Sequence, residues 1–141
     1  MNKAALTPQS LLCMPDKDYM NPQQQQFFKG MLERLKSETQ QQIESIKQDI
    51  ASADRGTDEL DRALTEEENR QRMRLAERQY LLLRKIDKAL SRIAQGTYGF
   101  CEITGDEIGL QRLLLRPTAE LCAEEKARQE HLERNFVQRH L

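Results

Sequence analysis

The sequence predicts a mainly α-helical protein: a long antiparallel coiled-coil hairpin with a small globular base. Two segments of about 30 residues each carry apolar residues at steps of three and four, which is the pattern of a helix with a narrow seam. A short break around Gly56 separates these segments, and a glycine-rich stretch follows the second one. Aromatic residues make up only 5% of the chain and charged residues 32%, a composition that suits solvated helices better than a thick core.

The first 21 residues are expected to form an irregular segment that packs on the base, because turn formers interrupt any periodicity there. Asn21-Pro22 then signals the start of the first helix, since Asn caps helices and Pro fits their first turn. The predicted seam of this helix contains Phe28, Met31 or Leu32, Leu35, Thr39, Ile43, Ile46, Ile50 and Ala53.

The second helix is predicted to begin at the capping-box sequence Thr65 to Glu68 and to end before Gly96. Its predicted seam contains Met73, Ala76, Tyr80, Leu83, Ile86 or Asp87, Leu90 and Ile93. Neither helix can bury its stripe alone, so each should supply the other's core in a hairpin over 22–95 with its tip at 54–65. A compact helical bundle is the alternative, but too few other apolar helices remain to cover both arms.

Residues 96–141 are predicted to form the base, a module of tight turns followed by a last helix. The turns are indicated by the glycine-rich runs 96–101 and 104–109. The last helix should begin near Thr118 or Ala119, after Pro117, and continue towards Phe136.

The base has the spacing of a four-ligand zinc site from which two ligands are missing. Cys101 and Cys122 each begin a Cys-x-x-Cys slot, but Thr104 and Glu125 occupy the second positions. A neutral hydroxyl does not replace a thiolate, and a carboxylate makes a harder and weaker site. We therefore expect no bound zinc and a base held by apolar packing instead. The side chains expected to provide it are Phe100, Ile103, Ile108, Leu110, Leu113, Leu114, Leu115 and Leu121.

The cysteines and the N-terminus favour a cytoplasmic protein. An odd number of cysteines (Cys13, Cys101 and Cys122) without a signal peptide argues against a disulfide framework, and a Cys101–Cys122 disulfide is disfavoured in a reducing cytosol. Cys13 has no assigned role. The net charge of −1 argues against a protein that coats DNA or a membrane surface. No segment approaches the ~20 apolar residues that span a bilayer.

The low net charge conceals a strong separation of charge along the hairpin. Residues 57–68 contain six acidic side chains and one arginine, whereas residues 70–92 contain eight basic side chains and two acidic ones. Acids at a helix start are favoured by the helix dipole, which accounts for Glu66 to Glu68 but not for Asp58 and Asp61 in the predicted turn. Carboxylates on a narrow projection suit insertion into a deep channel lined by cations or metal ions.

Three motifs together resemble the DksA family of RNA polymerase-binding transcription regulators, over most of the chain from about Tyr19 to about Arg128. Residues 58–63 match the family's Asp-x-x-Asp-Arg-Ala tip. The segment Gly-Thr-Tyr-Gly-Phe-Cys-Glu-x-x-Gly-x-Glu-Ile-Gly-x-x-Arg-Leu, from Gly96, matches the opening of its zinc finger. Arg-Pro-Thr-Ala-x-Leu-Cys, from Arg116, matches the second half. The departures at Thr104 and Glu125 make the chain resemble the zinc-independent paralogues.

The resemblance implies a monomeric, non-enzymatic protein that binds RNA polymerase and inserts its hairpin into the secondary channel, where it changes the stability of promoter open complexes. It assigns the tip role to Asp58, Asp61 and Ala63. It also implies joint action with the alarmone ppGpp, in a pocket shared with polymerase, and no cofactor. The matching ppGpp positions are Arg78, Leu82, Lys85, Arg116 and Lys126.

Two other functions explain part of the pattern. A Gre-type factor would use Asp58 and Asp61 to hold a metal and water for transcript cleavage. A plain coiled-coil adaptor would explain the seams but leave the tip motif and the finger remnant unexplained. A self-contained enzyme is disfavoured, because the sequence contains no nucleophile–base pair and no phosphate-cradling glycine loop.

Overall fold

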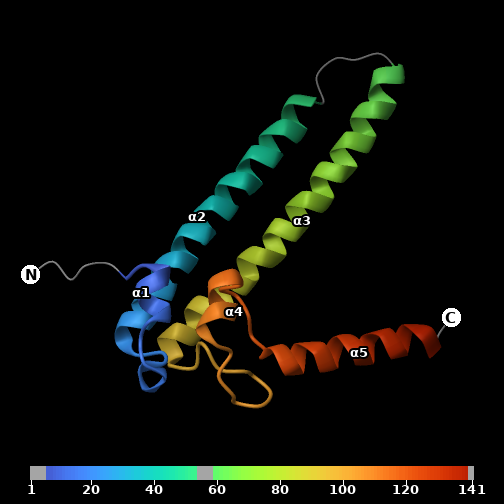
Figure 1. The fold of residues 1–141 in the computed structure, drawn as a ribbon. Helices are drawn as coiled ribbons and strands as arrows, with labels where there is room; N and C mark the ends of the chain where they lie inside the picture. Colours follow the sequence, from blue (N-terminus) through green and yellow to red (C-terminus); the bar gives the residue numbers. More distant parts are fainter. Residues whose placement is uncertain (1–5, 54–58, 140–141) are drawn as a thin grey trace, which may run out of the picture. The chain divides into compact units, whose positions relative to one another are not determined.

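The computed structural model describes residues 6–53 and 59–139, and in this part of the chain it contains helices and no β-strand. The elements are α1 (Pro8–Leu12), a 3-10 turn η1 (Asp16–Asp18), α2 (Pro22–Ala53), α3 (Glu59–Gln95), α4 (Leu110–Leu115) and α5 (Ala123–Arg139) (Figure 1). They fall into two compact units: a hairpin unit of residues 33–87, and a base unit formed by the residues up to 32 and from 88 onward. No helix in the described ranges is long and apolar enough to cross a membrane.

In the hairpin unit, α2 and α3 lie side by side and antiparallel, which confirms the predicted hairpin (Figure 1). Lys36 Nζ lies 2.8 Å from Asp87 Oδ1, and Lys47 Nζ lies 5.7 Å from the centroid of the Tyr80 ring. Of the predicted seam residues in this unit, Thr39, Ile43 and Ile46 of α2 and Ile86 of α3 are buried, whereas Leu35, Ile50 and Ala53 of α2 are only half-buried. The mainly helical fold class is therefore confirmed, with the apolar stripes of the two helices packed against each other.

The seam of α3 differs from the prediction at two positions. Met73 is 55% exposed and Tyr80 38% exposed, so neither is a core residue. The observed seam follows steps of four and three through positions 72, 76, 79, 83 and 86, which are half-buried or buried. The prediction gave apolar side chains priority over a regular helical spacing. It therefore assigned Met73 and Tyr80 to the seam instead of the adjacent positions 72 and 79.

The starts of α2 and α3 test the two predicted capping signals. The start of α2 at Pro22 is confirmed: Gln24 N–H donates to Asn21 Oδ1 (2.9 Å), and Met20 N–H donates to Gln24 Oε1 (2.9 Å). The predicted start of the second helix was wrong, because α3 begins at Glu59 and Thr65 lies within it. Residues 59–64 consist mostly of good helix formers, which carry the helix past the capping-box sequence. The predicted end before Gly96, whose φ is +79°, is confirmed.

The base unit contains more helix near the N-terminus than predicted, and its last helix begins later. The expected irregular segment includes α1, where Ser10 N–H donates to Thr7 Oγ1 (3.2 Å) and Thr7 N–H donates to Ser10 Oγ (2.8 Å). α1 packs against α4, a short helix that the sequence did not indicate. α5 begins at Ala123 and not near Thr118, because residues 116–119 form a turn in which Ala119 N–H donates to the Arg116 carbonyl (3.0 Å). Buried side chains of this unit include Leu11, Met20, Phe28, Tyr98, Ile108 and Leu113.

Candidate functional site

Three of the four former zinc-ligand positions, Cys101, Thr104 and Cys122, lie together in the base unit within a finger remnant, defined here as residues 96–125. Cys101 and Cys122 are buried and free, and the Thr104 hydroxyl lies 3.9 Å from the Cys122 sulfur. Glu125 is also buried, but its carboxylate faces Arg128, whose Nε lies 3.3 Å from Glu125 Oε2. The spacing therefore predicted the right neighbourhood for the two cysteines and the threonine.

Cys101 lies in a polar environment that favours its thiolate. Burial raises the pKa of the thiol, but hydrogen bonds from the Thr104 hydroxyl and from the backbone N–H groups of Thr104, Cys122 and Ile103 outweigh burial and lower the pKa to about 6. In metal sites built from cysteines, backbone N–H groups commonly donate to the ligand sulfur. The finger remnant retains such donors around Cys101.

The donor set does not fit the zinc ion for which such a finger is built. A structural zinc site takes four ligands in a tetrahedron, and here only two are thiols. The third position offers a neutral hydroxyl, and the carboxylate at the fourth is engaged by an arginine. In the described residues, no group of three or more His, Cys, Asp or Glu side chains is arranged to hold a metal ion.

Apolar packing, the predicted substitute for the metal, is only partly present. Ile108 is 7% exposed and Leu113 is fully buried, so these two do pack in the core. Ile103 is 58% exposed and Leu115 is 89% exposed, so the prediction was wrong for both. The remaining four candidates (Phe100, Leu110, Leu114 and Leu121) are half-buried.

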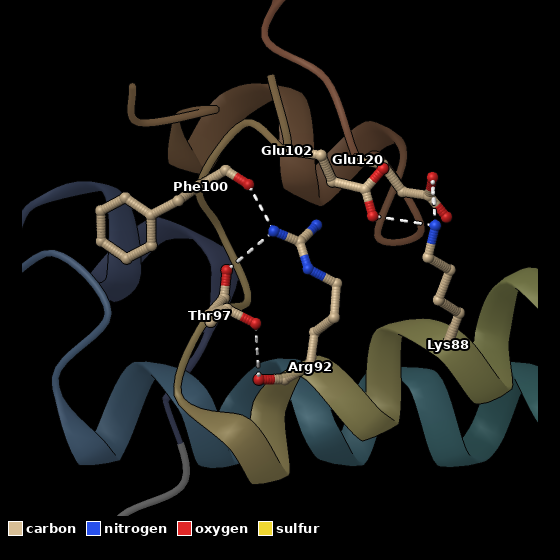
Figure 2. Close-up of polar contacts among 6 residues, drawn as sticks. All are labelled: Lys88, Arg92, Thr97, Phe100, Glu102 and Glu120. Carbon is tan, nitrogen blue, oxygen red and sulfur yellow. Dashed lines mark hydrogen bonds and ion pairs between the residues drawn. The ribbon is translucent and has the colours of Figure 1, made fainter. Parts of the chain in front are cut away.

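Arg92, near the end of α3, holds the chain where it enters the finger remnant (Figure 2). Its Nη2 atom donates to the carbonyl oxygens of Thr97 (3.0 Å) and Phe100 (2.6 Å). The Thr97 N–H donates back to the Arg92 carbonyl (2.9 Å). Because the arginine is only 9% exposed, these are shielded, charge-assisted hydrogen bonds, the stronger class of such bonds.

One turn earlier on α3, Lys88 joins the two halves of the finger remnant (Figure 2). Its Nζ lies 2.8 Å from Glu102 Oε1 in the first half and 3.0 Å from Glu120 Oε2 in the second. The Glu102 N–H also donates to the Glu120 carbonyl (2.9 Å). Hydrogen bonding to Glu102, and then to Glu120, raises the pKa of Lys88, and the bond from Lys88 lowers the pKa of Glu102.

Two tyrosine hydroxyls make further links across the base unit. Tyr19 donates to the Gly99 carbonyl (2.6 Å) and accepts from the Gly109 N–H (2.9 Å). Tyr98 donates to the Pro117 carbonyl (2.7 Å) and thereby ties both halves of the remnant together. Burial raises the pKa of both phenols, so each remains a donor at neutral pH. Gly99 has a φ of +90° and could not carry a Cβ atom, which would lie 2.7 Å from the side chain of Met20.

The other predicted site residues divide between the units. Asp58 and the side chain of Asp61 lie outside the described residues, and Ala63 is exposed near the start of α3. Arg78, Leu82 and Lys85 belong to the hairpin unit, where their spacing of four and three places them on one helix face. Arg116 and Lys126 belong to the base unit; Arg116 is exposed at the end of α4, and Lys126 Nζ lies 3.9 Å from Glu130 Oε1.

Two acidic residues of the stretch 57–68 form ion pairs within α3. Glu67 Oε2 lies 2.8 Å from Arg70 Nη2, and Glu68 Oε2 lies 3.7 Å from Arg72 Nη2. These pairs agree with a charged, solvated helix surface, but the explanation of Glu66 to Glu68 by the helix dipole was wrong, because α3 begins at Glu59 and these residues lie beyond its first turn.

Comparisons with known proteins agree across the chain. Residues 24–93 match the family model of the DnaK suppressor protein DksA, N-terminal domain, and residues 96–131 match the prokaryotic dksA/traR C4-type zinc finger. The chain is 38% identical to the RNA polymerase-binding transcription factor DksA of Caulobacter vibrioides, with 84% of each chain covered. It is 34% identical to the factor of that name from Escherichia coli K12, covering 87% of this chain and 82% of the relative. The structure of transcription factor DksA2 from Pseudomonas aeruginosa matches with a TM-score of 0.84 and 49% identity, over 91% of this chain and 99% of that one.

Proposed function

This chain belongs to the DksA family, and we propose that it is a transcription regulator that binds RNA polymerase directly and needs no zinc to do so. The relatives with 38% and 34% identity are named RNA polymerase-binding transcription factors, which supports the same partner here. As in those relatives, the role is regulation and not catalysis. The observation that carries the proposal is an antiparallel two-helix hairpin in a chain that matches the family along both of its family models.

The hairpin unit is the part that we propose to enter the secondary channel of polymerase. α3, most of which belongs to this unit, has 37 residues and corresponds to a helix of about 55 Å, and a pair of helices is narrower than a globular domain. Asp58, Asp61 and Ala63 would then act near the catalytic centre and shift the stability of promoter open complexes. The exposure of Ala63 is compatible with such a contact.

The alarmone ppGpp is the proposed effector. Arg78 and Lys85 are exposed and form no ion pair with another described residue, so their charges are available to phosphates. Leu82 on the same face offers an apolar contact. Arg116 and Lys126 supply the remaining cations of the proposed site, which includes polymerase as a second wall.

Zinc independence is supported by the contacts that hold the finger remnant. Lys88 and Tyr98 connect the two halves of the remnant that a tetrahedral zinc ion would otherwise join, and Arg92 fixes the start of the first half. A protein folded in the presence of a chelator should therefore bind polymerase as well as one folded with zinc. Loss of polymerase binding after chelation during folding would contradict this part of the proposal.

The regulatory role is tested by transcription from a ribosomal RNA promoter with purified polymerase. The protein should change transcript yield, ppGpp should enhance the effect, and Asp61→Asn should abolish the effect while leaving binding intact. Glu44→Gln, which removes an exposed carboxylate from α2, is the matched control and should behave like the parent. Arg78→Ala should lose only the enhancement by ppGpp.

The same preparation separates the alternatives. If Asp61→Asn behaves like the parent, an adaptor explains the chain better. If the protein shortens the RNA in backtracked elongation complexes, it is a cleavage factor of the Gre type and the proposed function is wrong.

A further inference from the structure

The turn that follows α4 carries Arg116, one of the cations that the proposed ppGpp site takes from the base unit. Its side chain is exposed and forms no hydrogen bond or ion pair with another described residue. The direction in which the guanidinium can reach is therefore set by the backbone of Arg116. Contacts that fix this backbone also fix where the charge is offered to a phosphate.

Local structure fixes the Arg116 backbone in part. Its N–H donates to the Arg112 carbonyl (2.8 Å), and its carbonyl accepts from the Ala119 N–H (3.0 Å). Pro117 follows, and a proline keeps the preceding residue out of the helical region, so Arg116 has φ −143° and ψ 78° and α4 ends before it. These bonds lie within residues 112–119, so they shape the turn without attaching it to the rest of the base unit.

The Tyr98 hydroxyl attaches this turn to the first half of the finger remnant. It donates to the Pro117 carbonyl (2.7 Å), one residue after Arg116. Tyr98 is itself held in the core: it is 2% exposed, its ring centroid lies 5.7 Å from that of Phe28, and its N–H donates to the Arg92 carbonyl (3.3 Å). The hydrogen bond therefore joins a buried part of the base unit to the turn that carries Arg116.

Other side chains bond the second half of the remnant further along the chain. Lys88 Nζ lies 3.0 Å from Glu120 Oε2, and Arg112 Nε donates to the Leu121 carbonyl (3.1 Å). Both contacts lie beyond the turn of residues 116–119, whereas Tyr98 binds within it. Loss of the Tyr98 hydroxyl should therefore release the turn while the rest of the second half stays attached.

We propose that Tyr98 is a positioning residue for ppGpp: its hydroxyl holds the turn of residues 116–119 so that Arg116 presents its guanidinium to a phosphate. Tyr98 does not touch the effector, because it is buried and its hydroxyl is already bonded. A side chain on a fixed backbone loses less conformational freedom on binding than one on a mobile backbone, so the affinity for ppGpp depends on this bond. The inference rests on the proposed function, in which ppGpp acts with Arg116.

The test is Tyr98→Phe, measured as the concentration of ppGpp that gives the half-maximal effect on transcription from a ribosomal RNA promoter. The variant keeps the ring beside Phe28 and removes only the hydroxyl. The half-maximal concentration should rise by about 3- to 10-fold, the factor that one hydrogen bond typically contributes to an equilibrium. The effect at saturating ppGpp should be that of the parent, whereas a loss of folded protein would lower the effect at every concentration.

Tyr19→Phe is the matched control. It removes another hydroxyl of the base unit, which is bonded to the Gly99 carbonyl (2.6 Å) in the first half of the remnant, and should leave the half-maximal concentration close to that of the parent. In an Arg116→Ala background, Tyr98→Phe should cause no further rise, because a residue that acts through Arg116 has nothing left to position. Equal shifts in the two tyrosine variants, or a full further rise in that background, would overturn the proposal.

Pro117→Ala is the second variant if Tyr98→Phe does not fold. Alanine keeps the carbonyl but frees residue 116 from the restriction that a following proline imposes, so the half-maximal concentration should rise here too, and not in the Arg116→Ala background. If Pro117→Ala responds like the parent, the backbone of Arg116 does not limit the affinity and the proposal is wrong. A parent that shows no response to ppGpp refutes the effector part of the proposed function and this inference with it. A responding parent with unchanged variants refutes this inference alone.

Discussion

The hairpin unit and the base unit are stabilised by different kinds of contact. In the hairpin unit, buried apolar residues repeat along two helices, and the ion pair between the arms, Lys36–Asp87, is exposed. In the base unit, partly buried polar groups link separate segments, as Tyr19 links to Gly99 and Tyr98 to Pro117, and Arg92 links the end of α3 to the finger remnant. A seam spreads its stabilisation over many similar side chains, whereas the base depends on a few that have no equivalent nearby. The two units should therefore respond differently to the loss of one side chain.

The largest effect is expected from Arg92→Met. Methionine keeps the apolar part of the side chain but leaves the carbonyl oxygens of Thr97 and Phe100 without their donor in a shielded place. Losing charge-assisted bonds from a buried arginine to partly buried acceptors should lower the free energy of unfolding by about 2 kcal/mol. Equilibrium urea unfolding followed by circular dichroism measures this.

Arg84→Met is the matched control for that variant. Arg84 is exposed on the same helix, in the hairpin unit, and should change the free energy of unfolding by less than about 0.5 kcal/mol. Arg92→Lys should not restore the parent's stability, because an ammonium cannot reproduce the planar fork. Equal losses in Arg92→Met and Arg84→Met would show that the base has no special dependence on polar links.

The next effect is a pH dependence that belongs to the base unit alone. The pKa of Cys101 is about 6 in the folded protein and 9.0 in a free thiol, so between these values the unfolded chain binds more protons. The free energy of unfolding should therefore rise from pH 6 to pH 9, and the thiolate contribution should be lost as the pH falls through 6. Thiolate absorbance in the ultraviolet should titrate near pH 6. Cys101→Ala should remove that titration and flatten the stability profile, and Cys13→Ala should change neither.

A smaller effect of opposite sign is expected in the hairpin unit. Gln79 lies in the α3 seam with its Oε1 atom buried and without a hydrogen-bond partner in the described structure. Gln79→Leu removes that unsatisfied acceptor and should raise the free energy of unfolding by about 1 kcal/mol. Tyr80→Leu, at the exposed neighbouring position, is the control and should not stabilise. A loss of stability in Gln79→Leu would mean that the seam at this position tolerates only a polar side chain.

The same contrast explains which features could be read from the sequence. The helical period of the apolar residues, together with Gly96, was sufficient to predict the two helices of the hairpin. The spacing of the former zinc ligands was sufficient to predict that Cys101, Thr104 and Cys122 lie close together. The links made by Arg92, Lys88 and Tyr19 were missed, because hydrogen bonds between distant residues leave no periodic signal. The only local hint was that Glu102 and Glu120 lie beside the cysteine positions. Hydrophobicity also misplaced Ile103 and Leu115, since it does not tell which side of a short loop faces the core.

The smallest effect is expected from Lys88→Met, although this residue joins both halves of the finger remnant. The Lys88 side chain is 50% exposed, and exposed ion pairs contribute only about 0.2 to 1 kcal/mol because water and salt screen them. The loss of stability should therefore stay below about 1 kcal/mol at low salt and shrink at high salt. The lowered pKa of Glu102 means that this contribution is present above the ordinary carboxyl pKa of 4.5 and is lost as the pH falls below it. A double-mutant cycle of Lys88→Met with Glu102→Gln isolates the pair, and Lys29→Met, an exposed lysine of α2, is the control. A coupling energy that persists at high salt would show that the Lys88 ion pairs are as shielded from solvent as the Arg92 hydrogen bonds. In that case the base unit would not contain two classes of polar contact, one buried and one screened by solvent.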